Sequence, residues 1–126
     1  LQDLMQNLVG IVRVQKEMEQ AVEGLQKLRE RASKVHVHGN REYNNGWHMA
    51  MDLPNMIEAS EMIARSAIER KESRGAHFRD DYPDKTAEGA SFNSVIRRGS
   101  NGEQVLERVP VKEMTAELKQ IIEEMK

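Results

Sequence analysis

The chain has 126 residues, a net charge of −2, 32% charged residues and no cysteine. This length predicts one domain, and the near balance of charge excludes a general attraction to nucleic acid or anionic lipid. No apolar run approaches the roughly 18 residues of a membrane-spanning helix, so we expect no direct membrane insertion. The lack of cysteine excludes disulfides, thiolate zinc sites and cysteine-ligated clusters within these residues, and it fits a cytoplasmic protein.

Apolar residues recur at helical spacing in two segments of the first third of the chain. The first segment is already apolar at Leu1, which indicates a fragment of a longer protein. The second segment runs from about Gln15 to Lys34, and Gly24 within it costs about 1 kcal/mol relative to alanine, which predicts a close approach by another element. Its expected apolar face comprises Met18, Ala21, Val22, Leu25, Leu28 and Ala32.

The junction between these two helices is Val9-Gly10-Ile11-Val12-Arg13. Val14 then occupies the position of an N-cap, and its side chain cannot accept a backbone N–H. Either the second helix begins uncapped, at a cost of about 1 kcal/mol, or the two helices run together.

Residues 35–46 are predicted to be connective. Val35 to His38 alternates like a short strand, and residues 44–46 have the composition of a turn. A helical pattern opens near Trp47, and Pro54 predicts a kink or a fresh helix start. From residue 55 onward the apolar stripe is expected to contain Met56, Ile57, Ile63, Ala64, Ala67 and Ile68, and the polar face Glu58, Glu61, Arg65, Glu69 and Glu72.

Within this third helix, Glu61 and Arg65 form a favourably ordered i, i+4 pair. Gly75 is suited to the C′ position that ends the helix. Residues 84–90 predict a loop, residues 92–98 and 103–109 a β-hairpin, and Thr115 the cap of a short last helix. The fold class is therefore mainly α: a three- to four-helix, spectrin-repeat-like bundle over residues 1–83, with a loop, hairpin and terminal helix over residues 84–126 in the same domain.

Three patterns with catalytic or ligand-binding potential are rejected. His36 and His38 could share a strand face near His48, but no acidic partner follows at a metal-ligand spacing. The pair Gly99 and Gly102 lies in a hairpin turn rather than between a strand and a helix, and residues 73 and 77 lack a third group and an oxyanion hole. We therefore predict no catalytic, cofactor-binding or metal-binding residue in this chain.

The segment from Glu72 to Tyr82 concentrates ionisable groups near a predicted helix end. One interpretation is a solvated turn with internal salt bridges, which composition alone favours. The other is a polar interface that docks this domain onto another. The ionisable residues are Glu72, Arg74, His77, Arg79, Asp80, Asp81 and Tyr82.

Several blocks in order, from about Met5 to Pro83, give the chain a specific resemblance. They are residues 9–13, residues 44–47, Leu53-Pro54-Asn55-Met56-Ile57, and residues 63–83 with Glu72-Ser73-Arg74-Gly75-Ala76-His77 at their centre. This set resembles the C-terminal helical domain of the flavoprotein subunit of succinate dehydrogenases and fumarate reductases. L-aspartate oxidase is similar, but it usually has leucine where Ala76 stands. The sequence departs from the family at Val14, commonly threonine, and at residues 94–96, commonly Lys-His-Thr.

The resemblance implies a parent enzyme that interconverts succinate and fumarate with FAD bound outside this chain. It also implies two partners, the FAD-binding domain of the same parent and an iron–sulfur subunit, and membrane association through other subunits. The segment would then be an inter-domain interface, formed by Ser73, Arg74, Gly75, His77, Arg79, Asp80 and Tyr82. The alternatives are the corresponding domain of L-aspartate oxidase and a stand-alone helical protein-interaction module.

Overall fold

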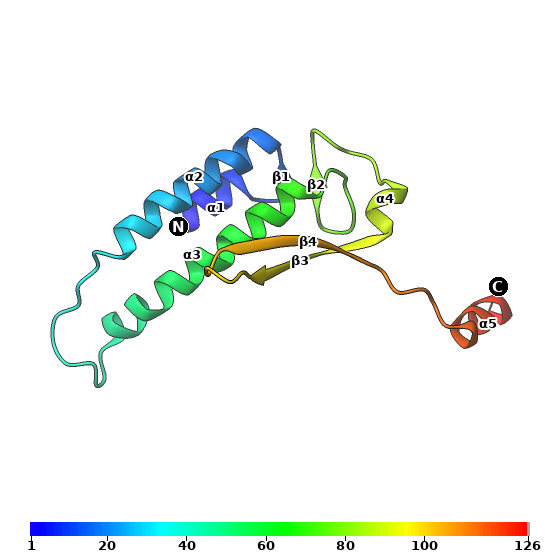
Figure 1. Cartoon of the computed structure of the whole chain (residues 1–126). Helices are drawn as coiled ribbons and strands as arrows, with labels where there is room; N and C mark the ends of the chain where they lie inside the picture. Colours follow the sequence, from blue (N-terminus) through cyan, green and yellow to red (C-terminus); the bar gives the residue numbers. More distant parts are fainter. Residues whose placement is uncertain (126) are drawn as a thin grey trace.

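The computed structural model describes residues 1–125, and its first three helices form a bundle on which the hairpin lies (Figure 1). This architecture confirms the predicted fold class. The helices are α1 (Gln2–Leu8), α2 (Gln15–Ala32), α3 (Asn45–Glu69), α4 (Ala87–Ala90) and α5 (Ala116–Glu124), and the strands are β1 (Val12–Arg13), β2 (Phe78–Arg79), β3 (Phe92–Arg98) and β4 (Gln104–Pro110).

The core lies between α2 and α3, which run side by side for most of their length (Figure 1). Met18, Ala21 and Leu25 of α2 are fully buried, as predicted from their spacing, and so are Ile57 and Ala64 of α3. The predicted stripe of α3 is only partly right. Met56 and Ile63 are about half exposed, whereas the side chain of Glu61 is buried.

Glu61 is accommodated within the bundle because two arginines reach it. Arg65 donates to it from one turn further along α3, at 2.6 Å, which confirms the predicted i, i+4 pair. Arg29 of α2 donates to its other oxygen at 2.7 Å. The two bonds satisfy a carboxylate that burial alone would disfavour, and they join α2 to α3.

Gly24 permits α1 to pack tightly on α2, as expected from its position inside a helix. A Cβ atom added at Gly24 would lie 2.3 Å from Cδ1 of Leu4, which belongs to α1. The leucine side chain therefore occupies the space that any larger residue would need. Val9 and Ala21 complete this small cluster with Ala64.

The start and course of α3 differ from the prediction in two ways. Residues 35–38 form no strand, and α3 begins after Asn44, whose Oδ1 accepts from the Trp47 N–H at 3.2 Å. The helix then continues through Pro54 without a fresh start. Proline removes the hydrogen bond to the Ala50 carbonyl and its ring crowds that group, but Pro54 lies on the exposed side of α3, where water can hydrogen-bond the freed carbonyl.

The end of α3 also differs, because Arg70 and not Gly75 terminates the helix. Arg70 is extended, with φ −81° and ψ 96°. Gly75 does have a positive φ of 60°, but it uses this conformation in a tight turn. The turn is closed by two backbone hydrogen bonds between Arg74 and His77, of 2.8 and 3.1 Å. The predicted C′ role is therefore wrong, although the need for glycine is real.

The C-terminal third contains the predicted hairpin and terminal helix. β3 and β4 are antiparallel, with register from Phe92 opposite Pro110 to Arg98 opposite Gln104, so Pro110 ends the second strand as expected. Thr115 caps α5 by accepting from the Leu118 N–H. The predicted loop of residues 84–90 is wrong at its end, because Thr86 caps the short helix α4.

We expect the Leu25→Ala variant to be about 2–5 kcal/mol less stable than the wild type, because Leu25 is fully buried between α2 and α3. Leu28→Ala, one turn further along at a half-buried position, should cost clearly less. Urea denaturation followed by circular dichroism gives both values. Equal costs for the two variants would contradict a core centred on Leu25.

Candidate functional site

The residues from Arg70 to Thr86, here called the signature loop, fold back from the end of α3 toward the start of α2. Within the loop, β2 pairs in parallel with β1, with Val12 opposite Phe78 and Arg13 opposite Arg79. The Asp80 N–H extends this pairing by donating to the Arg13 carbonyl at 3.0 Å. Two of the motifs noted in the sequence therefore lie side by side in space (Figure 1).

Arg79 holds the loop on the end of α3. Its side chain is fully buried, and Nη1 donates to the carbonyl of Ala67 at 2.9 Å and to that of Arg70 at 3.3 Å. These carbonyls lie at the helix C-terminus, where no N–H of a following turn reaches them and where a cation is favoured. The ring of Tyr82 covers the guanidinium, with 4.8 Å between its centroid and Cζ.

Asp81 neutralises this buried cation and at the same time caps α2. Its two oxygens accept from Nε and Nη2 of Arg79 at 2.6 and 2.7 Å. Oδ2 also accepts the backbone N–H of Gln15, at 2.9 Å. α2 is thus a separate helix whose N-terminal donor is satisfied by a residue far along the chain, where Val14 offers no side-chain cap. The bonds from Arg79 and then from Gln15 lower the pKa of Asp81 to about 2.

Glu72 is the buried carboxylate of the same loop. It accepts from Arg74 Nε at 2.9 Å, from Arg70 Nη1 at 2.6 Å and from the Thr86 N–H at 2.8 Å. These bonds, that from Arg74 above all, hold the pKa of Glu72 far below its usual range. Gly89 of α4 makes the packing possible, since a Cβ added there would lie 1.9 Å from Oε1 of Glu72.

His77 connects the loop to the first motif. Its Nδ1 lies 2.9 Å from Nη1 of Arg13, and its Nε2 lies 3.1 Å from the Arg70 carbonyl oxygen. An arginine can only donate and a carbonyl can only accept, so Nδ1 is the acceptor and Nε2 carries the proton. Burial lowers the pKa of His77, the carbonyl opposes this effect, and the charge of Arg13 adds to the lowering. The ring is therefore a neutral connector.

The remaining residues predicted for the interface fall into two groups. Ser73 is buried, and its hydroxyl accepts from the Arg79 N–H at 2.8 Å and donates to the Tyr82 carbonyl at 2.9 Å. Gly75 and Asp80 are exposed at the surface of the loop. The side chains of Arg79, Arg74 and His77 make their hydrogen bonds to groups within the domain. What the segment presents to the outside is therefore largely the turn at Gly75 and the side chains next to it.

Sequence reasoning missed the two acids that organise the loop, Glu72 and Asp81, as site residues. Both were counted in the charged segment, and their spacing of two residues from Arg74 and Arg79 could have indicated local pairs. The contribution of Arg13 had no such signal, because it lies 64 residues from its partner His77.

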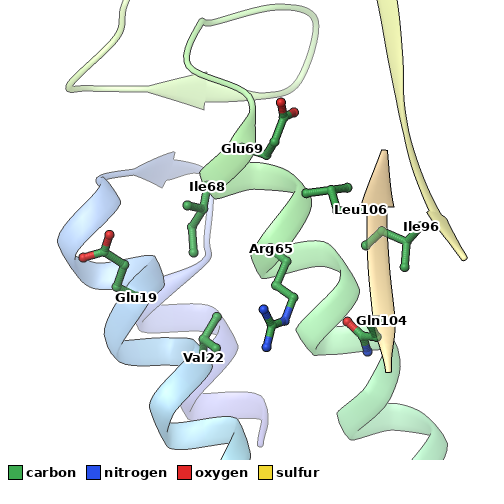
Figure 2. Close-up of a pocket in the computed structure, with 8 residues that line it drawn as sticks. All are labelled: Glu19, Val22, Arg65, Ile68, Glu69, Ile96, Gln104 and Leu106. Carbon is green, nitrogen blue, oxygen red and sulfur yellow. The ribbon is translucent and has the colours of Figure 1, made fainter. Parts of the chain in front are cut away.

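A separate cleft of about 430 Å³ lies between α2, α3 and the hairpin, and Figure 2 shows its lining. Val22, Ile68 and Leu106 make it largely apolar. The amide oxygen of Gln104 is buried there without a hydrogen-bond partner, while its Nε2 donates to the Glu58 carbonyl at 3.3 Å. The lining contains no serine, histidine or other nucleophile–base pair. The full lining is Glu19, Val22, Arg65, Ile68, Glu69, Ile96, Gln104 and Leu106.

Within residues 1–125, no three His, Asp or Glu side chains are grouped so that they could hold a metal ion. The helices of this part of the chain are also too short or too polar to cross a membrane.

Comparison with known proteins places this geometry in a family. The family model described as fumarate reductase flavoprotein C-term matches residues 1–123. The fumarate reductase flavoprotein subunit of Haemophilus influenzae is 34% identical over 86% of this chain and 18% of its own length. L-aspartate oxidase 1 of Ralstonia nicotianae is 39% identical over 66% of this chain and 15% of its own length.

Among solved structures, Mycobacterium smegmatis Sdh1 in complex with UQ1 matches 97% of this chain and 21% of the compared chain, with 37% identity and a TM-score of 0.88. This chain belongs to the family of C-terminal domains of fumarate reductase and succinate dehydrogenase flavoprotein subunits. It spans less than a fifth of the length of the curated relatives described above.

We expect the Asp81→Ala variant to lose about 3 kcal/mol of stability, because it leaves the buried guanidinium of Arg79 without its counter-ion. Asp80→Ala, at the exposed neighbouring position, is the matched control and should change stability by less than about 0.5 kcal/mol. Denaturant titration at pH 7 gives both values. Because the folded pKa of Asp81 is depressed, its contribution should be fully present above about pH 5 and be lost as the pH falls toward 2.

We expect His77 to titrate below 6.5 and to be protonated at Nε2 when neutral. Its contribution to stability is then complete above about pH 6.5 and is lost as the pH falls from there through the lowered pKa. Nitrogen-15 NMR of the imidazoles between pH 8 and 4 measures the pKa of His77 and identifies its protonated nitrogen. The exposed His38 is followed in the same spectra. A His77 that titrates above 6.5, or one with its proton on Nδ1, would contradict the assigned bonds.

Proposed function

We propose that this chain is the non-catalytic domain that packs against the FAD-binding domain of its parent. The parent interconverts succinate and fumarate, holds FAD outside these residues and exchanges electrons with an iron–sulfur subunit. It associates with the membrane through further subunits. Membership of the family supports this proposal, as does the small share of its relatives that the chain covers.

The observation that carries the proposal is an apolar patch beside the signature loop. Val12 and Phe78 are opposite each other in the β1–β2 pair, and both are substantially exposed, as is Ile11 next to them. In an ordinary domain surface such residues are scattered, whereas these three adjoin at one short sheet, two of them in its strands and Ile11 directly before β1. A second domain resting on this end would cover them together with the turn at Gly75.

The buried network then has a structural role in the interface. Arg79, Asp81 and Glu72 fix the backbone of the loop before any partner arrives, so docking orders few further groups. This loop conformation is supported from beneath the contact surface by the side chains of Ser73, Arg74, His77 and Tyr82. Gly75, Asp80 and the apolar patch would make the direct contacts. The domain thereby helps to fix the geometry of the flavin-binding domain without touching the reacting atoms.

We expect Ala76→Glu, at the exposed tip of the signature loop, to lower the flavin content and the melting temperature of the purified full-length parent. The variant introduces a charge where the second domain would rest, and docking would have to bury it. Flavin absorbance per protein and a thermal melt give the two values. Ser100→Glu, at the exposed hairpin turn, is the matched control. If both variants keep wild-type flavin content, stability and turnover, the interface lies elsewhere.

L-aspartate oxidation is a second candidate for the parent activity, because an L-aspartate oxidase is among the relatives. Dye-linked turnover of succinate, fumarate and L-aspartate by the full-length parent separates the two. Activity with aspartate alone would assign the parent to the oxidase branch and leave the packing role of this domain unchanged.

A further inference from the structure

The C-terminal arm, residues 111–125, extends from the hairpin and ends in α5 (Figure 1). Every residue of this arm is exposed. The side chains Leu118, Ile121, Ile122 and Met125 repeat at i, i+3, i+4 and i+7, so they form one continuous apolar face. Val111 and Met114 extend apolar surface toward the body, and each of the six is 43% or more exposed.

A helix of this kind needs a surface to lie on. α5 has nine residues, whereas isolated helices shorter than about 12 residues are marginal in water even with favourable sequences. A Thr115 cap and an apolar stripe are consistent with a helix that is stabilised by packing rather than by propensity. The surface that α5 packs against therefore lies outside residues 1–125.

The arm limits where that surface can be. It begins at Val111, whose N–H donates to the Ser91 carbonyl at 2.8 Å, directly after α4. Residues 111–115 can span at most about 18 Å even when fully extended. Since α4 contacts Glu72 of the signature loop through Gly89, α5 must dock close to the end of the domain that carries this loop.

The charges of α5 argue against a membrane surface as the occupant. Its polar side carries Glu117, Glu123 and Glu124 but only one cation, Lys119. Helices that lie on anionic lipid are rich in lysine and arginine on this side. The apolar face is also too short to repay the entropy of capturing a free partner, whereas a tethered helix docks within its own chain at a high effective concentration.

The arm is a regular part of the family domain. The family model extends to residue 123. The match to Mycobacterium smegmatis Sdh1 covers 97% of this chain, and the remaining 3% of 126 residues, about four residues, is shorter than the arm. In that structure the matched region is 21% of a longer polypeptide, so most of the chain available to cover α5 lies outside the matched domain.

We propose that α5 is a tethered clasp that docks through Leu118, Ile121, Ile122 and Met125 onto the portion of the parent polypeptide preceding Leu1. The docking surface lies beside the proposed contact of the signature loop. The inference rests on the proposed packing of this domain on the FAD-binding domain. It adds a second, separate attachment between this domain and the FAD-binding domain, made by α5.

The test uses the full-length parent in its flavin-loaded state, with a photo-crosslinking amino acid at position 121. After irradiation and proteolysis, mass spectrometry locates the adduct. We expect a crosslink within the same polypeptide, upstream of Leu1. A crosslink to another subunit, a crosslink to a second copy of the chain, or no adduct would each overturn the proposal.

Two matched double variants of the same parent provide an independent readout. Leu118→Gln with Ile122→Gln introduces two glutamines on the apolar face of α5. Glu117→Gln with Lys119→Gln introduces two glutamines on its polar side. We expect the first pair to accelerate amide hydrogen exchange of α5 at least about tenfold, and the second to leave it near the wild-type rate. Equal rates in the two variants would overturn the docking of the apolar face.

The outcome is separable from that of the proposed function. If Ala76→Glu lowers flavin content while the adduct from position 121 lies on another subunit, the signature-loop interface stands and the clasp does not. If the adduct lies upstream of Leu1 while Ala76→Glu has no effect, the clasp stands without the loop contact.

Discussion

The pairing of Arg79 with Asp81 is the interaction on which the rest of this domain depends. The guanidinium of Arg79 could not be buried alone, because an unpaired charge in the interior costs several kcal/mol, and Asp81 supplies its counter-ion from the surface. Together they satisfy the last carbonyls of α3 and the first free N–H of α2. One ion pair thus fixes the relative position of the two long helices at this end, and it brings β1 and β2 into register.

This arrangement gives the charged segment a different meaning from either of its two simple interpretations. It is no solvated turn, since Arg79 and Glu72 are almost completely buried. Its strongest charges also point inward, so a partner would meet a preformed backbone turn and a small apolar sheet rather than a set of extended arginines. A rigid loop of this kind suits a supporting domain, because it presents one shape without first being ordered.

Two attachments of different character would then join the domain to its parent. The signature loop offers a fixed surface next to the bundle, while α5 is carried on an extended arm with its apolar side exposed. The bundle that carries both has its own buried core of Met18, Leu25 and Ile57. Such a core lets the domain hold its shape while the signature loop and α5 contact another part of the polypeptide.

Local patterns in the sequence determined much of the fold. Helical spacing identified the buried face of α2, turn chemistry identified the hairpin, and Thr115 identified the start of α5. These inferences succeed because each depends on residues within a few positions of one another. The resemblance also rested on ordered local blocks, and the family model bears it out.

Only the tertiary structure decided the features that depend on residues far apart. The cap of α2 comes from Asp81, which lies 66 residues from Gln15, so the absence of a local cap at Val14 could not indicate its source. Glu61 is buried because Arg29 reaches it from another helix, and Pro54 is tolerated because its side of α3 is exposed. Local propensity describes what a segment can do alone, whereas charge burial and capping are determined by which segments meet.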